Sequence, residues 1–346
     1  MPSAGSQSHS GGDGPSASAF SRAPLFCGLG VGLVALLSAI LVLLVGRRPA
    51  LSLAGAVALA GLAGAATTMA LRAIGAAQRE SAERDRVSRE EYRELAAVHG
   101  QVQSNLEEAG RVQRGLMPGR SQQPFPRDVL LAHAFVPVLT VGGDYYDFKR
   151  TGPGTLAMLF VDVSGHGVGS ALLTAIVKTV FEVLDESNLS PARFVSEVNQ
   201  ILVRITPPDS FVALVFAVYG VESRLLTYVN AGHQPLPMIV RRDGRKVEAL
   251  GDGGLVAGFD INCVYLEDRV RLSPGDRFVL CTDGITESAN EDGEMLGRER
   301  LVTLLADTLD APAEDIPDRI LEAVGQHSGT APQSDDRTIL VMEVLS

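Results

Sequence analysis

The sequence predicts an α+β domain with antiparallel sheet, preceded by two transmembrane helices and a helical connector. In the C-terminal two thirds of the chain, strand-like and helix-like segments occur in consecutive groups, which favours α+β layering over a doubly wound sheet. Two stretches of 21 residues near the N-terminus contain no charged residue. A seven-residue apolar repeat lies between these stretches and the strand-rich region. The length of 346 residues allows about two domains.

The formal charge of the chain is −11, and it is distributed unevenly. Residues 1–72 carry a net charge of +3, so that −14 remains on residues 73–346. This acidic balance argues against a nucleic-acid-binding protein, which normally presents a basic surface. The three cysteines are Cys27, Cys263 and Cys281, which are odd in number and far apart. A disulfide framework and a Cys-rich zinc site are therefore excluded.

The N-terminal region is predicted to be a membrane anchor. Residues 1–24 are rich in Ser, Gly, Ala and Pro, and we expect them to form a disordered tail. Residues 25–45 and 51–71 are the two charge-free stretches, and about 20 residues are needed for a helix to cross the bilayer. The short segment 46–50 is expected to be a tight turn, so residues 25–72 would form a transmembrane hairpin. The immediate second stretch argues against a signal peptide.

Arginine counts predict the orientation of this hairpin. The short turn contains Arg47 and Arg48, whereas six arginines flank the hairpin, namely Arg22, Arg72, Arg79, Arg84, Arg86 and Arg89. Basic residues accumulate on the cytoplasmic side of a membrane. We therefore expect a two-span protein of the cell membrane, in contact with the lipid bilayer, with its N-terminus and its C-terminal domain in the cytoplasm.

Residues 73–117 are predicted to be a helical connector. No proline occurs between residues 78 and 117, and Pro118 then ends the helix. A heptad seam is formed by Leu95, Val98, Val102, Asn105, Ala109, Val112 and Leu116. Such a seam is typical of a parallel dimeric coiled coil, in which a polar residue sets the register, and it would make the protein a homodimer. The other interpretation is a single helix that packs its apolar stripe on its own domain.

The domain over residues 118–346 is expected to alternate groups of strands and helices. The strand-like runs are 129–136, 156–163, 211–219, 225–230, 236–241, 277–281 and 339–344. The helix-like runs are 168–186, 191–204, 297–309 and 316–326. Ser190 followed by Pro191 is a favourable start for the second of these helices.

Aspartates at strand ends, next to glycines, are the most informative feature of this domain. They are Asp144, Asp162, Asp283, Asp335 and Asp336. A single Asp-Gly after a strand is usually a turn. Several converging carboxylates, however, repel one another unless a cation lies between them. Oxygen ligands favour Mg²⁺ or Mn²⁺ over zinc, and two such ions can activate water and bind a phosphoryl oxygen.

Five ordered motifs carry a resemblance to a known family. They are Gly142-Gly143-Asp144-Tyr145-Tyr146-Asp147, Asp162-Val163-Ser164-Gly165-His166-Gly167, Asn230-Ala231-Gly232-His233-Gln234-Pro235, Thr282-Asp283-Gly284-Ile285-Thr286-Glu287 and Ser334-Asp335-Asp336-Arg337-Thr338. Together they resemble the SpoIIE/RsbU type of bacterial PPM phosphatases, which are metal-dependent, type 2C-like serine/threonine phosphatases. The resemblance covers about residues 108–345.

The resemblance implies an αββα sandwich that holds two Mn²⁺ or Mg²⁺ ions. By the motifs, Asp162 would bridge both ions, Asp144 and the backbone carbonyl of Val163 would complete one site, and Asp283 and Asp335 would hold the other. Asp147 and Asp336 would bind through water or orient the ligands. The implied substrate is phosphoserine or phosphothreonine on a regulatory protein, typically an anti-sigma-factor antagonist.

The general acid stays open at this point. In eukaryotic relatives a histidine follows two residues after the bridging aspartate, whereas Ser164 stands at that place in this chain and His166 lies two residues further on. Either His166 or a water on the metal could protonate the leaving group.

Three other functions fit the sequence less well than a phosphatase. The Gly142-Gly143-Asp144 sequence resembles the start of the diguanylate cyclase motif, but Tyr145 replaces its second acid. Ser164, His166 and His233 lack a nucleophile-elbow pattern, so a hydrolase triad is not favoured and His233 is expected to be structural. A catalytically silent membrane adaptor that binds a partner would be expected to have lost ligands, and the four main aspartates are all present.

Overall fold

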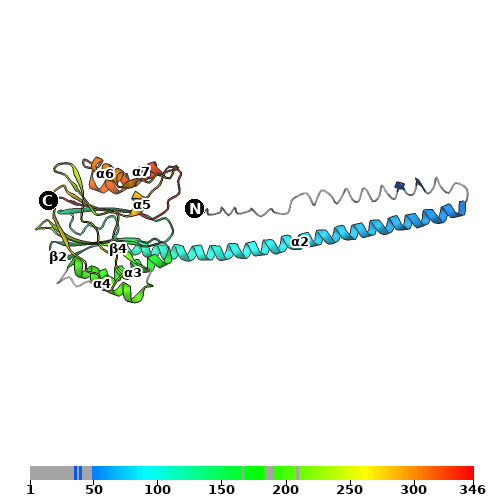
Figure 1. Cartoon of the computed structure of the whole chain (residues 1–346), viewed down its shortest axis with the longest axis horizontal. Coiled ribbons are helices and arrows are strands. Elements are labelled where there is room, and N and C mark those ends of the chain that lie inside the picture. The colour runs from blue at the N-terminus through cyan, green and yellow to red at the C-terminus, as the bar shows by residue number, and fades with distance from the viewer. Residues whose placement is uncertain (1–34, 37–38, 41–48, 166, 184–189, 208–209) are drawn as a thin grey trace, which may run out of the picture. The chain divides into compact units, whose positions relative to one another are not determined.

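The computed structural model describes residues 35–36, 39–40, 49–165, 167–183, 190–207 and 210–346 (Figure 1). It divides into two compact units, residues 1–98 and 99–346. The predicted tail and almost all of the first predicted span lie outside the described residues. His166, one of the two candidate acids, also lies outside them.

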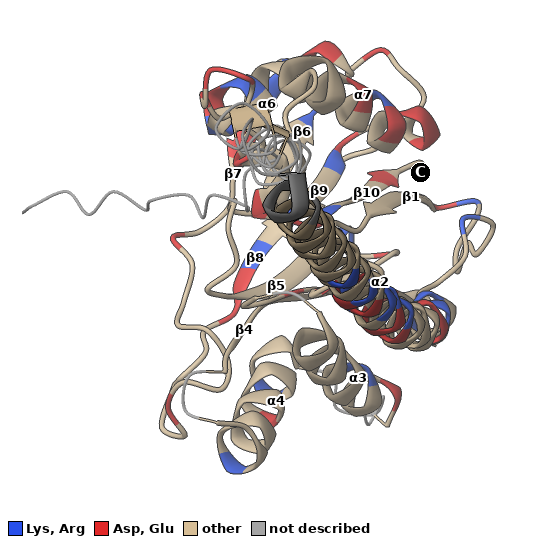
Figure 2. Ribbon diagram, turned by 90° about the vertical axis from the view of Figure 1, so that its right-hand side faces the viewer, with Lys and Arg blue, Asp and Glu red and all other residues tan. Residues whose placement is uncertain are grey.

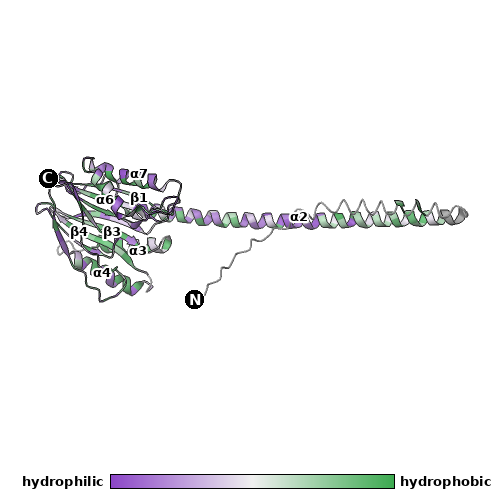
Figure 3. Ribbon diagram, turned by 45° about the horizontal axis from the view of Figure 1, so that its top comes forward, coloured by the Kyte–Doolittle hydropathy of each residue, from purple (hydrophilic) through white to green (hydrophobic). Residues whose placement is uncertain are grey.

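Helix α2 (Pro49–Leu116) contains 68 residues and includes the second predicted span and the predicted connector as far as Leu116. Pro49 and Ala50, which the sequence analysis placed in a turn, belong to the helix, because proline is well suited to a first helical turn. Among the described residues, this is the one helix long and apolar enough to cross a membrane. Figure 3 shows its beginning as mostly hydrophobic and its later part as mixed.

The second unit contains two five-stranded antiparallel sheets. The first has the order β1 (Val129–Val136), β10 (Arg337–Val344), β9 (Arg277–Cys281), β6 (Met238–Arg241) and β7 (Lys246–Ala249). The second has the order β2 (Asp144–Gly152), β3 (Thr155–Val163), β4 (Val212–Gly220), β5 (Leu225–Ala231) and β8 (Asp268–Arg271).

Helices cover the outer face of each sheet, as Figure 2 shows. Those on the second sheet are α3 (Val168–Glu182) and α4 (Pro191–Ile205). Those on the first sheet are α6 (Gly297–Asp307) and α7 (Ile316–Ser328). The short helix α5 (Asp283–Thr286) lies between β9 and α6 in the chain, and η2 (Ala313–Asp315) lies between α6 and α7. The expected αββα sandwich is therefore confirmed.

Three apolar clusters hold these layers together. One lies between the sheets, and each of the others lies between a sheet and its helices. Along β3, Met158 and Phe160 face the other sheet, whereas Leu159 and Val161 face α3 and α4. Burial of both faces explains why β3 is a continuous apolar run instead of an alternating one.

Every strand and helix predicted within residues 118–346 is present, with ends that shift by a few residues. Strands β2, β7 and β8 and the short helices α5 and η2 were not predicted from the sequence. Strand β2 has the sequence DYYDFKRTG, whose polar residues hide its strand character, and it forms because it pairs with β3 along its length. Strands β7 and β8 are short and largely exposed, so they show no apolar pattern.

Candidate active site

Asp144 and Asp162 lie directly opposite each other on adjacent strands. Asp144 begins β2 and Asp162 comes just before the end of β3, and the two residues form a register pair. The carboxylate of Asp144 is 3% exposed, and its Oδ2 accepts hydrogen bonds from the hydroxyls of Thr282, at 2.8 Å, and Thr338. Because Thr338 belongs to β10 and Thr282 directly follows β9, these bonds join the two sheets at the site.

Burial and neighbouring negative charge raise the pKa values of three carboxylates of the site. Burial, and then the negative charge of Asp162, raises the pKa of Asp144 well above its usual value. Burial raises the pKa of Asp162 to about 8, and the charges of Asp283 and Asp335 add to this effect. Burial, with the charge of Asp335, also raises the pKa of Asp283 to about 6. The four aspartates predicted from the sequence as principal ligands are therefore close enough for their charges to interact.

Asp335 and Asp336 have different surroundings. Asp336 is 2% exposed, and its carboxylate accepts backbone N–H bonds from Val138 at 2.8 Å, Gly143 at 2.8 Å and Asp144 at 3.4 Å. Asp335 is exposed, and one of its oxygens accepts the backbone N–H of Asp336 at 2.8 Å. Asp336 therefore fixes the backbone that carries Asp144. Asp335 is exposed to solvent, and its charge acts on the carboxylates of Asp162 and Asp283.

Glycines allow the backbones of the site to approach closely. A Cβ atom on Gly143 would lie 2.8 Å from the carbonyl oxygen of Val163 and 2.9 Å from that of Gly165. A Cβ atom on Gly284 would lie 1.9 Å from the carbonyl oxygen of Asp336. Neither position can accept a side chain without moving backbone, so the carbonyl of Val163 is kept beside the strand that begins with Asp144.

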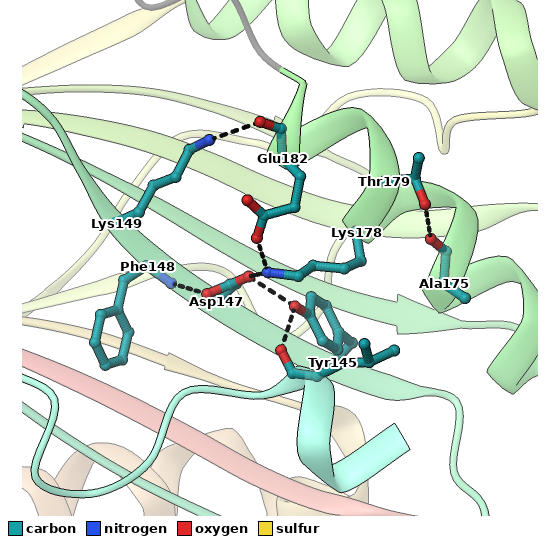
Figure 4. A network of polar contacts seen from close by, with 9 residues as sticks. Tyr145, Asp147, Phe148, Lys149, Ala175, Lys178, Thr179 and Glu182 are labelled. Atoms are coloured by element: carbon teal, nitrogen blue, oxygen red, sulfur yellow. Dashed lines mark hydrogen bonds and ion pairs between the residues drawn. The ribbon is translucent and has the colours of Figure 1, made fainter. Parts of the chain in front are cut away.

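Asp147 lies on the other face of β2, in a separate network (Figure 4). Its Oδ2 accepts hydrogen bonds from the hydroxyl of Tyr145 at 2.7 Å and from Lys178 of α3 at 2.5 Å. Lys178 also pairs with Glu182. The hydroxyl of Tyr145 lies 3.2 Å from the carbonyl oxygen of Leu116, the last residue of α2. Asp147 thus connects β2 with α3 and does not join the four principal aspartates.

The end of α2 is bonded directly to the loop before Asp144. The side-chain amide of Gln113, which is buried, donates to the carbonyl of Gly142 at 2.8 Å and accepts its N–H at 3.0 Å. The predicted heptad seam does not share the burial of Gln113, because Val102 and Val112 are 50% and 63% exposed. Only Leu116 of the seam is seen to pack on the domain core.

Ser164 and His233 have structural hydrogen-bond partners. The hydroxyl of Ser164 donates to the carbonyl of Phe211 at 3.1 Å. His233 is fully buried, and its Nε2 lies 3.0 Å from the carbonyl oxygen of Cys281, the last residue of β9. Burial lowers the pKa of His233 to about 4, so it is neutral at physiological pH. Within the described residues, these two side chains form no nucleophilic triad.

The donor set fits a hard divalent cation by its chemistry. In the described part of the chain, no three His, Cys, Asp or Glu side chains stand close enough together to hold a metal ion. The aspartates are nevertheless near enough to raise each other's pKa values, and their oxygens are the ligands that Mg²⁺ and Mn²⁺ prefer. A cation between them would remove this repulsion.

Four contributors to the site have roles that sequence reasoning missed. Thr282, Glu287 and Thr338 occur inside the recognised motifs, but no local rule shows that the hydroxyls bind Asp144 or that the charge of Glu287 acts on Asp162. Gln113 stands 29 residues before its partner Gly142. The register of α2 against the domain, which a single sequence does not reveal, creates that contact.

The sequence is similar to a known protein family and to several of its members. A family model described as stage II sporulation protein E (SpoIIE) matches residues 152–345. The phosphoserine phosphatase RsbU of Bacillus subtilis is 26% identical over 235 residues, which are 68% of this chain and 69% of RsbU. The protein IcfG of a Synechocystis strain is 25% identical, and the match spans 68% of this chain but only 41% of IcfG.

Solved structures show the same fold. The SiaA-PP2C domain of Pseudomonas aeruginosa has a TM-score of 0.64 and 25% identity, and the match covers 72% of this chain and 99% of that domain. A structure containing the PP2C phosphatase domain of SpoIIE from Bacillus subtilis has a TM-score of 0.53 and 20% identity, covering 62% of this chain and 63% of that one.

Proposed function

Because the chain belongs to the SpoIIE family of PPM-type protein-serine/threonine phosphatases, we propose that it is a membrane-tethered, metal-dependent enzyme that acts on a phosphorylated regulatory protein. The observation that carries this proposal is the group formed by Asp144, Asp162, Asp283 and Asp335, whose mutual repulsion calls for cations.

Two Mn²⁺ or Mg²⁺ ions are the proposed cofactors. Asp144, Asp162, Asp283, Asp335 and the backbone carbonyl of Val163 would hold these ions. When bound, such ions supply Lewis-acid stabilisation of a phosphoryl group and lower the pKa of water. Without them, the negative charge of the four aspartates would repel a phosphate dianion.

The chain's own residues would orient this centre. The hydroxyls of Thr282 and Thr338 donate hydrogen bonds to Oδ2 of Asp144, and these bonds fix the rotation of its carboxylate. Asp336 holds the backbone N–H groups of Gly143 and Asp144, so the start of β2 keeps its position when charge at the site changes. Preorganised ligands of this kind lower the cost of reorganisation during the reaction.

Phosphoserine or phosphothreonine on a protein is the proposed substrate. RsbU and RsbP, two relatives of this chain, carry the name phosphoserine phosphatase. An anti-sigma-factor antagonist is the proposed substrate protein, and this choice rests on the resemblance of the motifs to the SpoIIE/RsbU type.

Helix α2 is the proposed link to a cell membrane and to a second copy of the chain. Its early part is apolar enough to span a bilayer, and the arginines that flank the predicted hairpin favour a cytoplasmic position for the catalytic domain. The exposed seam positions Val98, Val102 and Val112 would become buried in a parallel dimer. Dimerisation would order the end of α2, and the bonds between Gln113 and Gly142 would pass this order to the loop before Asp144.

Phosphate release from a synthetic phosphoserine peptide tests the proposed function. The full chain, purified in detergent and treated with EDTA, should be inactive and should recover activity when Mn²⁺ is added. Phosphate release that persists after chelation and dialysis would contradict the metal-dependent mechanism.

A further inference from the structure

The loop between β7 and β8, residues 250–267, exposes an unusual number of large apolar side chains. We call it the apolar loop. Its exposed members are Leu255, Phe259, Ile261, Val264 and Leu266, and Val264 is 81% exposed. Single exposed apolar residues are normal on a protein surface, but five within twelve residues are typical of an interaction site.

The backbone of the apolar loop is held firmly against the domain. Ala257 exchanges two backbone hydrogen bonds with Val212, at 2.8 and 2.9 Å. The buried side chain of Asn199 accepts from the N–H of Gly258 at 2.8 Å and donates to the carbonyl of Asp260 at 2.9 Å. The outward side chains therefore belong to an ordered loop.

The apolar loop lies beside the catalytic site. Val163, the residue after Asp162, pairs with Val212 on one side, and Ala257 pairs with Val212 on the other. Ser164 donates its hydroxyl to Phe211, the neighbour of Val212. Two strand spacings of about 4.8 Å put the loop roughly 10 Å from the strand that carries Asp162.

The charge of this region favours a basic partner. Residues 247–268 contain no lysine or arginine, and Asp252 and Asp260 lie within the apolar loop. An anionic lipid surface would be repelled by these aspartates. A polypeptide with basic and apolar side chains would be complementary to them.

We propose that the apolar loop is the docking surface for the phosphorylated substrate protein. It receives an extended segment that carries a large apolar residue and a basic residue about three positions from the phosphoserine, because three extended residues span roughly 10 Å. This inference rests on the proposed phosphatase function and adds the chemistry by which that site selects its substrate.

Two synthetic phosphoserine peptides test the proposal on the full chain with Mn²⁺. The first has Leu and Arg at the third and fourth positions on both sides of the phosphoserine, and the second has Gly there. The wild type should prefer the first by about tenfold or more in kcat/KM, since one apolar contact commonly discriminates by this amount. In the double variant Phe259→Ser/Val264→Ser the ratio should fall to about one.

Leu345→Ser is the matched control. Leu345 is also exposed, but it follows the end of β10 opposite to Asp336, so this variant should keep the wild-type preference. A wild type without preference, or a double variant that retains it, would overturn the proposal. Loss of a dimer in light scattering caused by the double substitution would overturn it too, because the loop would then bind a second copy. Failure of the wild type to hydrolyse p-nitrophenyl phosphate would instead refute the phosphatase function.

Discussion

The carboxylate of Asp336 accepts the backbone N–H of Gly143 at 2.8 Å, and this bond ties the start of β10 to the start of β2. Its neighbour Asp335 faces the other carboxylates and is exposed. Asp336 thus holds the backbone before β2, whereas Asp335 is the residue of the pair that we propose as a metal ligand.

Asp335→Asn should therefore affect mainly activity, whereas Asp336→Ala should affect mainly stability. The first change should lower kcat by several orders of magnitude, because a neutral amide is a poor ligand for Mn²⁺, and it should not lower the melting temperature of the metal-free protein. The second should lower the melting temperature by several degrees, because buried N–H groups lose their acceptor at a cost of about 1–3 kcal/mol each. Kinetics and thermal unfolding of both variants provide the check. If the two variants lose the same amount of kcat and of melting temperature, Asp335 and Asp336 do not have these different roles.

Thr338→Val should reduce activity through Asp144. The substitution keeps the shape of the side chain but removes a hydroxyl that donates to the buried carboxylate. A hydrogen bond to a charged group contributes about 1.5–3 kcal/mol, so kcat/KM should fall roughly 10- to 150-fold. Thr338→Ser should restore most of the rate, and a fully active valine variant would show that the bond does not position Asp144.

The metal-free protein should become less stable as the pH rises from about 5 to about 8. The folded-state pKa values of Asp162 and Asp283, about 8 and about 6, are above the usual value of 3.8. The folded protein therefore binds more protons than the unfolded protein in this range, and its stability falls as these protons are lost. Thermal unfolding across this pH range measures the effect.

Added Mn²⁺ should raise the melting temperature more at pH 8 than at pH 5, because protons compete with the ion for the same oxygens. Asp162→Asn provides the control, since this variant should lose most of the pH dependence. A wild-type melting temperature that does not change between these pH values would contradict the repulsion between the carboxylates.

Val102→Asp/Val112→Asp should break the proposed dimer. Both valines are exposed in the single chain and occupy apolar seam positions, where charge opposes coiled-coil pairing. Light scattering should show a monomer, and activity should fall because the helix end that carries Gln113 loses its order. Gln103→Asp/Ser104→Asp adds the same charge outside the seam and should remain dimeric.

A monomeric but fully active seam variant would make the connector only a spacer. A wild type that is already monomeric at micromolar concentration would exclude the dimer itself.

The sequence predicted those parts of the molecule that local patterns encode. The apolar run of β3 is visible because both of its faces are buried, and the Asp-Gly motifs mark the strand ends that meet at the site. Strand β2 was missed because its polar residues gain their strand conformation from pairing with β3.

Roles that depend on tertiary contacts were not readable from the sequence. Asp147 stands three residues after Asp144, and the alternation of β2 turns it to the opposite face, toward Lys178. Asp335 and Asp336 are identical in type and adjacent, so only their burial distinguishes them. The bonds of Asp144 to Thr282 and Thr338 span 138 and 194 residues of chain.

Mn²⁺ binding and phosphate release, measured on the same samples of full-length protein, test the central claim most directly. Equilibrium dialysis of the EDTA-treated wild type should show two Mn²⁺ ions per chain, and phosphoserine peptide hydrolysis should appear as they bind. Asp162→Asn should lose both ion binding and hydrolysis while it remains folded. Undiminished hydrolysis by Asp162→Asn, or by the wild type with no Mn²⁺ or Mg²⁺ bound, would contradict the account.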